Sequence, residues 1–344
     1  MKQFIWCQSV PIRGNPGISN YNMASDNPTI DLSKLVGISI REDLPMETVN
    51  QVLSNPPFIP IALALNLRTV SSQTLASNIV YRSGALSHLP ATSLSLLKSA
   101  LGIVTIFDLR SRGEREKHPS PEVDGIKTVW IPSSIDIEPN ASMVETATTK
   151  GVLEKDKLSL QGVELYDFVS NGGEPGYISM YTNILKTHKE PYKAVFQELK
   201  DGQGGILFHC TAGKDRTGVL AALIHALLDS PEDIVALDYG MTRVGVEPFK
   251  EMLLGTMLER MGRGSEMTLQ DLVKEVPGFE AMAGVRGPTI LAFLRSLNKN
   301  YGSAIGYFAE GNILYSGAKC YLVEELGFSV EDLNKIRQRL VVHS

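Results

Sequence analysis

The chain has few of the residues that would build a disulfide framework or a metal site. Among its 344 residues there are only three cysteines, and Cys7, Cys210 and Cys320 lie far apart. A disulfide framework requires several closely spaced cysteines, and a structural zinc site requires Cys or His ligands at short spacing. We therefore expect no metal and no cofactor. Scarce cysteine also favours a reducing compartment, which predicts a cytoplasmic location.

The sequence also lacks a long apolar run and an excess of basic charge. No hydrophobic stretch approaches the roughly 20 residues that a helix needs to cross a bilayer. The 33 Lys and Arg residues are outnumbered by 38 Asp and Glu residues, which gives a net charge of −5. Nucleic-acid-binding domains carry the opposite balance. We therefore expect neither stable membrane insertion nor a nucleic-acid partner, and the oligomeric state stays open.

The length of the chain and its polar segments predict one large domain. A chain of 344 residues can bury a sizeable core. Residues 1–30 are rich in Asn, Ser, Gly and Pro, and we expect them to lack fixed structure. Residues 31–344 are expected to form a single domain. Within it, residues 138–175 are a polar insertion, for which two interpretations stay open: a lid over the functional site, or a surface decoration.

Apolar periodicity and capping residues predict several helices and strands. The run at 103–110 is β-branched and apolar, as in a buried strand. A helix is expected at 91–101, capped by Thr92 or Ser93, and the last helix is expected to start at Ser329. A pair of helices is expected to be divided at Pro191. Further predicted elements are strands at 127–131 and 206–209 and helices at 45–53, 177–186, 192–199, 216–228, 248–261, 288–299 and 330–340.

The most informative stretch is residues 206–220, with the sequence ILFHCTAGKDRTGVL. It predicts a buried strand, a tight polar loop and an apolar helix, with Cys210 opening the loop and Arg216 closing it. A loop of this length can turn its backbone N–H groups inward and form an anion-binding nest at a helix N-terminus. The same positive end favours the thiolate of Cys210. Because the guanidinium of Arg216 can grip two phosphate oxygens, the stretch predicts a phosphate held over a nucleophile.

These residues resemble a known signature. His209-Cys210-x5-Arg216-Thr217-Gly218 resembles that of the cysteine-dependent phosphatases, and the fuller string HCTAGKDRTG resembles the microbial tyrosine/serine protein phosphatase family. Members of that family are similar to both protein tyrosine phosphatases and phosphoinositide phosphatases. The resemblance implies a protein-tyrosine-phosphatase-like α/β fold, in which helices flank a central, mostly parallel sheet. A nucleotide-binding loop is excluded, because Asp215 follows Lys214 where that loop has Ser or Thr.

Other parts of the chain resemble the same family, from about residue 66 to residue 340. The matching elements are Asn66-Leu67-Arg68, Asp108-Leu109-Arg110-Ser111 with Glu114, and Asp238-Tyr239. For the acidic residues after the 103–110 strand we favour a scaffold role. We expect Glu114 or Asp108 to pair with Arg82 or Arg110, and Asp238-Tyr239 to pack behind the loop.

The resemblance also implies roles for the residues of the loop. Cys210 would attack phosphorus, and Arg216 and the loop N–H groups would stabilise the phosphate oxygens. Thr217 could donate a hydrogen bond to the sulfur, and His209 could hold the loop through its ring nitrogens. The predicted substrate-binding residues are His209, Thr211, Ala212, Gly213, Lys214, Asp215, Arg216 and Thr217.

Two assignments within this mechanism stay open. The leaving oxygen needs a proton, and the favoured donor is Asp136, in the loop after the 127–131 strand, with Asp215 as the alternative. Lys214 has two interpretations: a cation for the additional phosphates of a lipid substrate, or a residue that only attracts anions or forms a salt bridge with Asp215.

The expected function is hydrolysis of phosphomonoesters through a phosphocysteine. The substrates expected first are phosphotyrosine proteins, with phosphoserine and phosphothreonine proteins added in a dual-specificity enzyme. The alternative is a phosphoinositide or an inositol polyphosphate. A catalytically silent phosphate-binding module is a third reading, which the presence of Cys210 disfavours.

Overall fold

The structure is a computed structural model, and it describes residues 30–70, 79–137, 159–160, 163–262, 266–301 and 315–341. The expectation about the N-terminal segment lies outside these residues, and so does the expectation about most of the insertion at 138–175.

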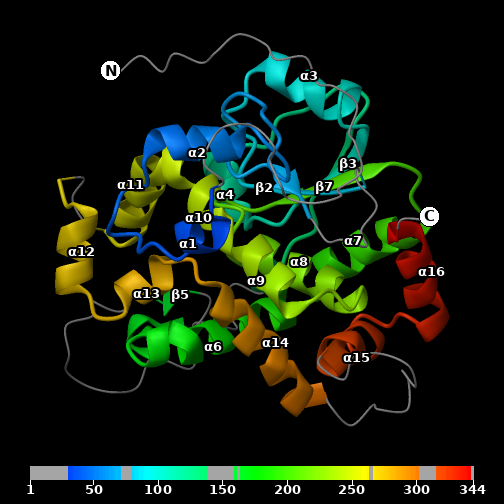
Figure 1. The fold of residues 1–344 in the computed structure, drawn as a ribbon. Helices are drawn as coiled ribbons and strands as arrows, with labels where there is room; N and C mark the ends of the chain where they lie inside the picture. The colour runs from blue at the N-terminus through cyan, green and yellow to red at the C-terminus, as the bar shows by residue number, and fades with distance from the viewer. Residues whose placement is uncertain are drawn as a thin grey trace.

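A five-stranded sheet forms the centre of the fold, with the strand order β1-β2-β7-β3-β4 (Figure 1). Only the first pair is antiparallel, and every other pair is parallel. The strands are β1 (Arg68–Thr69), β2 (Val80–Ser83), β7 (Gly205–His209), β3 (Ile103–Asp108) and β4 (Lys127–Val129). The expected central, mostly parallel sheet is therefore confirmed. Because β7 is the middle strand and is buried on both faces, its sequence is an unbroken apolar run.

The register of the sheet brings three strand ends together at one edge. Ser83 at the end of β2 and Asp108 at the end of β3 both lie opposite His209 at the end of β7. The chain leaves β7 at Cys210, so the loop from Cys210 to Arg216 begins where these three carboxyl ends meet. Open parallel sheets bind ligands at this edge.

Alternate side chains of β7 pack into two different hydrophobic cores, one on each face of the sheet. Ile206 and Phe208 pack into the larger core, while Leu207 belongs to a smaller one under α3 (Ala91–Ser99). In Figure 1, α3 covers one face of the sheet and a thick layer of helices covers the other. That layer comprises α6 (Glu174–Thr187), α7 (Lys189–Asp201), α8 (Asp215–Leu227), α9 (Glu232–Gly240), α14 (Gly287–Tyr301), α15 (Ser316–Glu324) and α16 (Val330–Leu340).

A third cluster joins the first helices to the middle of the chain. Val49 and Leu35 pack with Met241 and Val244, at the short helix α10 (Thr242–Gly245). The helices of this region are α1 (Leu32–Val36), α2 (Met46–Leu53) and α11 (Lys250–Arg260), and nearby in the chain lie α12 (Leu269–Glu275) and α13 (Phe279–Ala283). The remaining elements are α4 (Arg112–Lys117), α5 (Ser134–Ile137), β5 (Ser159–Leu160), β6 (Val163–Glu164), η2 (Leu165–Phe168), η3 (Asn171–Gly173) and η4 (Glu247–Phe249).

Two boundary predictions are wrong and one is confirmed. The pair of helices divides at His188 rather than at Pro191, because proline is tolerated within the first turn of α7, where N–H groups have no intrahelical partner. Neither Thr92 nor Ser93 caps α3, whose N-cap position is Pro90. Ser329 does cap α16, through a capping box with Asp332.

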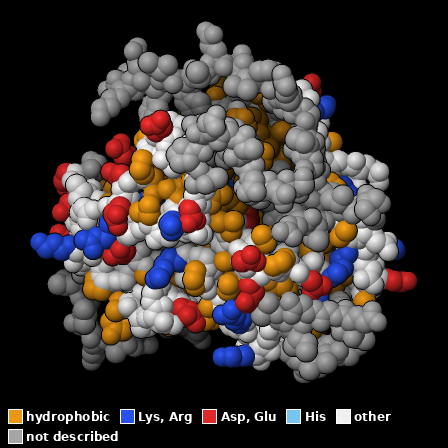
Figure 2. All heavy atoms as spheres, in the orientation of Figure 1, with side chains coloured by type: hydrophobic (Ala, Val, Ile, Leu, Met, Phe, Trp, Pro, Cys, Tyr) orange, Lys and Arg blue, Asp and Glu red, His pale blue; other side chains and the backbone are white. Residues whose placement is uncertain are grey.

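In the described part of the chain, no helix combines the length and the apolar character that crossing a bilayer requires. On the face drawn in Figure 2, basic and acidic side chains of the described residues are intermingled.

The contact between α14 and α15 gives a test of the packing. A Cβ at Gly317 in α15 would overlap the backbone of Leu297 in α14. We therefore expect Gly317→Ala to force the two helices apart and to lower the free energy of unfolding by about 1–3 kcal/mol. Urea denaturation measures this change.

The matched control is Gly255→Ala, in the exposed part of α11, where a Cβ would have no neighbour within 4 Å. That substitution should stabilise the protein by about 0.5–1 kcal/mol, because alanine favours helix more than glycine does. Equal stability changes in the two variants would contradict the close helix packing.

Candidate active site

The loop from Cys210 to Arg216 connects the central strand β7 to helix α8. Cys210 is 3 % exposed and lies at the base of the loop. Gly213 has a positive φ of 70°, and a Cβ there would lie 2.6 Å from the carbonyl oxygen of Ser83 in β2. Only glycine fits this backbone conformation so close to a neighbouring strand. The loop is therefore packed tightly against the edge of the sheet.

Every backbone carbonyl from His209 to Lys214 accepts a hydrogen bond. The donor–acceptor pairs are Leu109 N to His209 O at 2.8 Å, His209 Nδ1 to Cys210 O at 3.2 Å, Ala85 N to Thr211 O at 2.9 Å, Asn66 Nδ2 to Ala212 O at 3.1 Å and to Gly213 O at 3.3 Å, Arg82 Nη2 to Gly213 O at 3.0 Å, and Gly218 N to Lys214 O at 2.7 Å.

The N–H groups of the same loop are left without protein partners. Within the residues that the structure describes, no acceptor takes a hydrogen bond from the N–H of Thr211, Ala212, Gly213 or Lys214. In a trans peptide the N–H points opposite to the carbonyl. Because the carbonyls are bonded to the surrounding scaffold, the N–H groups face the other way. This is the arrangement that a tetrahedral anion above Cys210 requires.

Arg216 is held by a pair of hydrogen bonds to Glu114. Its Nη1 lies 2.5 Å from Oε2 of Glu114, and its Nη2 lies 2.9 Å from Oε1. A capping box with Ser111 fixes Glu114 in the first turn of α4. Burial would raise the pKa of Glu114, but the Arg216 guanidinium outweighs it and holds that pKa well below its ordinary value. The pair therefore keeps the guanidinium oriented.

The expectation that Glu114 or Asp108 pairs with Arg82 or Arg110 is confirmed. Asp108 does pair with Arg110, at 2.9 Å. Glu114 pairs with neither Arg82 nor Arg110, because the capping box directs its carboxylate toward the loop and Arg216. Arg82 instead binds Asp238 and the loop, as given above for Gly213.

His209 precedes Cys210 and Thr217 follows Arg216, and both side chains are buried. Burial lowers the pKa of His209, and its Nδ1 donates a hydrogen bond to the carbonyl of Cys210. Its Nε2 lies 3.9 Å from Asp108 and makes no hydrogen bond. The hydroxyl of Thr217 is buried and has no partner among the described residues, so its bond to the sulfur stays a prediction.

The side chain of Lys214 is turned into the protein. It is 8 % exposed, and its Nζ donates to Tyr177 Oη at 3.0 Å and to the carbonyl of Met282 at 2.6 Å. The ammonium also lies 3.7 Å from Asp215, which is the salt bridge expected as one of its two roles. Helix α13, which carries Met282, therefore closes one side of the loop.

The two candidate proton donors have different surroundings. Asp136 accepts hydrogen bonds on both oxygens, from Arg112 N at 2.9 Å and from the hydroxyl of Ser133 at 2.7 Å. It thereby attaches α5 to the start of α4. Asp215 accepts from Tyr181 Oη at 2.9 Å on Oδ1, and its Oδ2 has no hydrogen-bond partner within the described ranges. Asp215 lies within the loop, and its side chain is 35 % exposed.

Several residues around the loop could not be identified from the sequence. Tyr192 donates to the carbonyl of Arg216 at 2.7 Å, and Tyr181 holds Asp215. Burial, followed by the positive charge of Arg216, lowers the pKa of His188 to about 4. The position of His188 depends on the break between α6 and α7, which the sequence placed differently.

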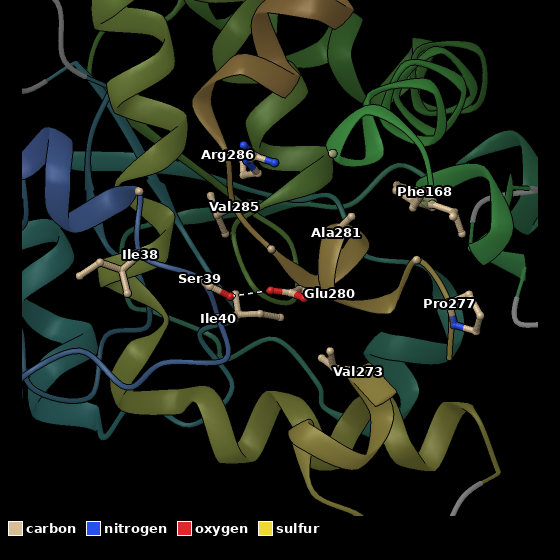
Figure 3. A pocket seen from close by; sticks show the side chains of 15 residues that line it. Ile38, Ser39, Ile40, Phe168, Val273, Pro277, Glu280, Ala281, Val285 and Arg286 are labelled. Atoms are coloured by element: carbon tan, nitrogen blue, oxygen red, sulfur yellow. Dashed lines mark hydrogen bonds between the residues drawn. The ribbon is translucent and has the colours of Figure 1, made fainter. Parts of the chain in front are cut away.

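A separate cavity of about 470 Å³ lies beside α13 (Figure 3). Its walls include Ile38, Phe168 and Arg286, and Ser39 donates a hydrogen bond to Glu280 across it at 2.7 Å. None of the loop residues 210–216 lines this cavity. The loop from Cys210 to Arg216 and the cavity are therefore different places on the molecule. In the described residues, no cluster of three or more His, Cys, Asp or Glu side chains could hold a metal ion.

The Arg216–Glu114 pair gives a test with a defined pH dependence. Glu114→Gln leaves the buried guanidinium of Arg216 without its counter-charge, which should cost about 3 kcal/mol of unfolding free energy at neutral pH. The pKa of Glu114 is lowered in the folded protein, so the stabilising effect is complete above its ordinary pKa of 4.5 and is lost as the pH falls below it. Urea denaturation between pH 7 and pH 3 measures the difference.

The control for this test is Glu116→Gln, on the exposed side of the same helix. It should change the unfolding free energy by less than about 0.5 kcal/mol at any pH. If Glu114→Gln behaved like this control at pH 7, the pair would not stabilise the fold.

Comparisons with known proteins agree with this geometry. The family model described as the tyrosine phosphatase family matches residues 65–314. The triple specificity protein phosphatase PtpB of Mycobacterium tuberculosis is 25 % identical over 263 residues, which cover 73 % of this chain and 92 % of the relative. A putative tyrosine-protein phosphatase of Cupriavidus necator is 26 % identical over 67 % of this chain and 73 % of its own length. A tyrosine-protein phosphatase of Nostoc commune is 26 % identical over 63 % of this chain and 68 % of its own length. The chain belongs to the tyrosine phosphatase family.

Proposed function

We propose that this phosphatase hydrolyses phosphotyrosine proteins, and phosphoserine and phosphothreonine proteins as well, through a phosphocysteine at Cys210. The observation that carries the proposal is the set of unpartnered loop N–H groups above the buried Cys210, closed by Arg216. Such a ring of donors complements the equatorial oxygens of a phosphoryl group in transfer.

The proposed reaction has two displacements at phosphorus. In the first, the thiolate of Cys210 forms an S–P bond while the P–O bond to the leaving group breaks and the leaving oxygen takes a proton from an acid. In the second, water attacks the phosphocysteine, gives its proton to the same carboxylate, and displaces the thiolate as inorganic phosphate forms. Arg216 and the loop N–H groups stabilise the negative charge in both steps.

Of the two candidate acids, the surroundings favour Asp215. One of its oxygens has no hydrogen-bond partner in the described part of the chain, and it lies in the loop that binds the phosphate. Both oxygens of Asp136 are engaged in attaching α5 to α4. An acid that protonates a leaving group must present a free oxygen to it. We therefore propose Asp215 as the proton donor and a positioning role for Asp136.

The surroundings of Lys214 favour protein substrates over phosphoinositides. Its ammonium is bonded to Tyr177 and Met282, so it does not extend from the loop toward further phosphates of a polyphosphorylated ring. A phosphoinositide headgroup is nevertheless the second candidate substrate, because the HCTAGKDRTG signature resembles a family whose members are similar to phosphoinositide phosphatases as well. The proposed location is the cytoplasm, whose reducing conditions keep a nucleophilic thiol in its reduced form.

Substrate class is tested by phosphate release from a panel. The panel contains a phosphotyrosine peptide, a phosphoserine peptide, a 3-phosphoinositide and inositol hexakisphosphate, all measured without added metal. We expect turnover of the peptides by the wild type and none by Cys210→Ser, because the serine hydroxyl is not ionised at neutral pH. Cys320→Ser, which changes a buried cysteine of α15, is the matched control and should stay active.

Each outcome of the panel has a distinct meaning. A variant Cys210→Ser that still turns over the peptides would exclude the phosphocysteine. A wild type that hydrolyses only the lipid or only the inositol polyphosphate would replace the proposed substrate class and leave the mechanism intact.

The identity of the acid is tested by leaving-group dependence. Asp215→Asn should lower kcat for the phosphoserine peptide by about 10²- to 10³-fold, because a serine alkoxide needs a proton to depart. The loss should be much smaller for an aryl phosphate with an acidic phenol, and the basic limb of the pH–rate profile should disappear. Asp136→Asn should show neither change. The reverse pattern in these two variants would make Asp136 the acid.

A further inference from the structure

Two carbonyls of the phosphate-binding loop depend on side chains from a distant segment. The carbonyls of His209, Thr211 and Lys214 are held by backbone N–H groups. The carbonyls of Ala212 and Gly213, in contrast, are bonded by Asn66 Nδ2 at 3.1 and 3.3 Å, and that of Gly213 also by Arg82 Nη2 at 3.0 Å. Asn66 precedes β1 and Arg82 lies in β2, so neither belongs to the loop.

This part of the loop is the one that most needs support. Gly213 adopts a left-handed conformation, and glycine rotates its flanking peptides at low cost. If the peptide between Ala212 and Gly213 turned over, a carbonyl dipole would replace the N–H of Gly213 in the phosphate pocket. A negative oxygen facing a phosphate would repel it. The orientation of these two peptides is therefore decisive for anion binding.

The two supporting side chains are themselves anchored in a buried ionic cluster. Arg82 Nη1 lies 2.5 Å from Oδ2 of Asp238, and Arg68 Nε lies 3.4 Å from Oδ1. Arg68 also donates to the backbone carbonyl of Asn66 at 3.2 Å and to its side-chain oxygen. All four residues are 2 % exposed or less. A carboxylate in α9 thus fixes both groups that bond the loop.

The cluster also carries more positive than negative charge. Two guanidinium groups face one carboxylate, and a third titratable group, His225, has its Nε2 3.6 Å from Asp238 Oδ2. Burial, followed by repulsion from Arg82, lowers the pKa of Arg68 to about 9, which leaves it charged at neutral pH. An excess of positive charge directly behind the loop favours an anion in front of it.

We propose that Asn66 and Arg82, anchored by Asp238, are positioning residues that hold the carbonyls of Ala212 and Gly213 outward and thereby turn the loop N–H groups onto the transferred phosphoryl group. The proposal rests on the proposed phosphatase function and goes beyond it, because none of the three touches substrate. It assigns a purpose to Asn66 in particular: its amide supplies two donors in one place, and it tolerates the positive φ of 56° that this position has.

The test is Asn66→Gly, which keeps the backbone conformation and removes the donor. The matched control is Asn171→Gly, at an exposed asparagine that has a positive φ of 47° and whose side chain donates a hydrogen bond to Glu174. A second variant, Asn66→Asp, keeps the size and the positive φ but has no N–H to donate. If Asn66→Gly does not fold, Asn66→Asp tests the positioning role in its place.

Two readouts separate positioning from stability. At temperatures well below the melting transition, we expect Asn66→Gly and Asn66→Asp to lower kcat by about 10²-fold with a much smaller change in KM, because misplaced donors stabilise the transition state less. In a Cys210→Ser background, the Kd of inorganic phosphate measured by calorimetry should rise about tenfold, as expected for the loss of one hydrogen bond to a charged group. Asn171→Gly should change neither.

The outcomes distinguish this proposal from the proposed function. If the wild type hydrolyses phosphoesters and both Asn66 variants keep its kcat and its phosphate affinity, the positioning role is wrong and the function stands. If the wild type releases no phosphate from any substrate, the function fails. In that case the Kd of inorganic phosphate still tests the positioning role of Asn66, because the binding measurement does not require turnover.

Discussion

The site depends on the outward hydrogen bonding of the loop carbonyls. Six consecutive carbonyls, from His209 to Lys214, are bonded to strand ends, to neighbouring loops and to the first turn of α8. Because each peptide is planar and trans, its N–H group points away from its carbonyl and therefore into the pocket. A phosphate in such a pocket meets donors that need no rearrangement when charge develops, which is the condition for electrostatic catalysis. The rest of the fold serves this geometry.

The sheet and the buried charges each supply part of that support. The parallel pairing of β2, β7 and β3 brings Ala85, Leu109 and the cysteine loop to one edge, where backbone groups can bond each other. The charged side chains next to the loop are buried and have partners of opposite charge: Glu114 binds Arg216, and Asp238 binds the two arginines behind the loop. Because an isolated buried charge is costly, each pair also ties the reaction site to the stability of the fold.

The sequence predicts well what depends on local pattern, and less well what depends on distant contacts. The strand, loop and helix around Cys210 were predictable because apolar period, glycine and the Cys–Arg spacing all lie within fifteen residues. The pairing of Glu114 with Arg216 was not predicted, because the two residues are 102 positions apart and only the folded chain shows which arginine the carboxylate faces. The role of Asn66 was out of reach for the same reason: it is separated from Gly213 by 147 positions. The boundary between α6 and α7 was predicted at Pro191 and lies at His188, because the first turn of α7 tolerates a proline.

The central claim is tested most directly by a crystal structure of Cys210→Ser with inorganic phosphate bound. The account predicts one phosphate in the loop, with the N–H groups of Thr211 to Arg216 and the Arg216 guanidinium about 3 Å from its oxygens, and with the carbonyls of Ala212 and Gly213 still bonded to Asn66 and Arg82. A phosphate bound elsewhere, or a loop in which either of these carbonyls points toward the anion, would contradict it.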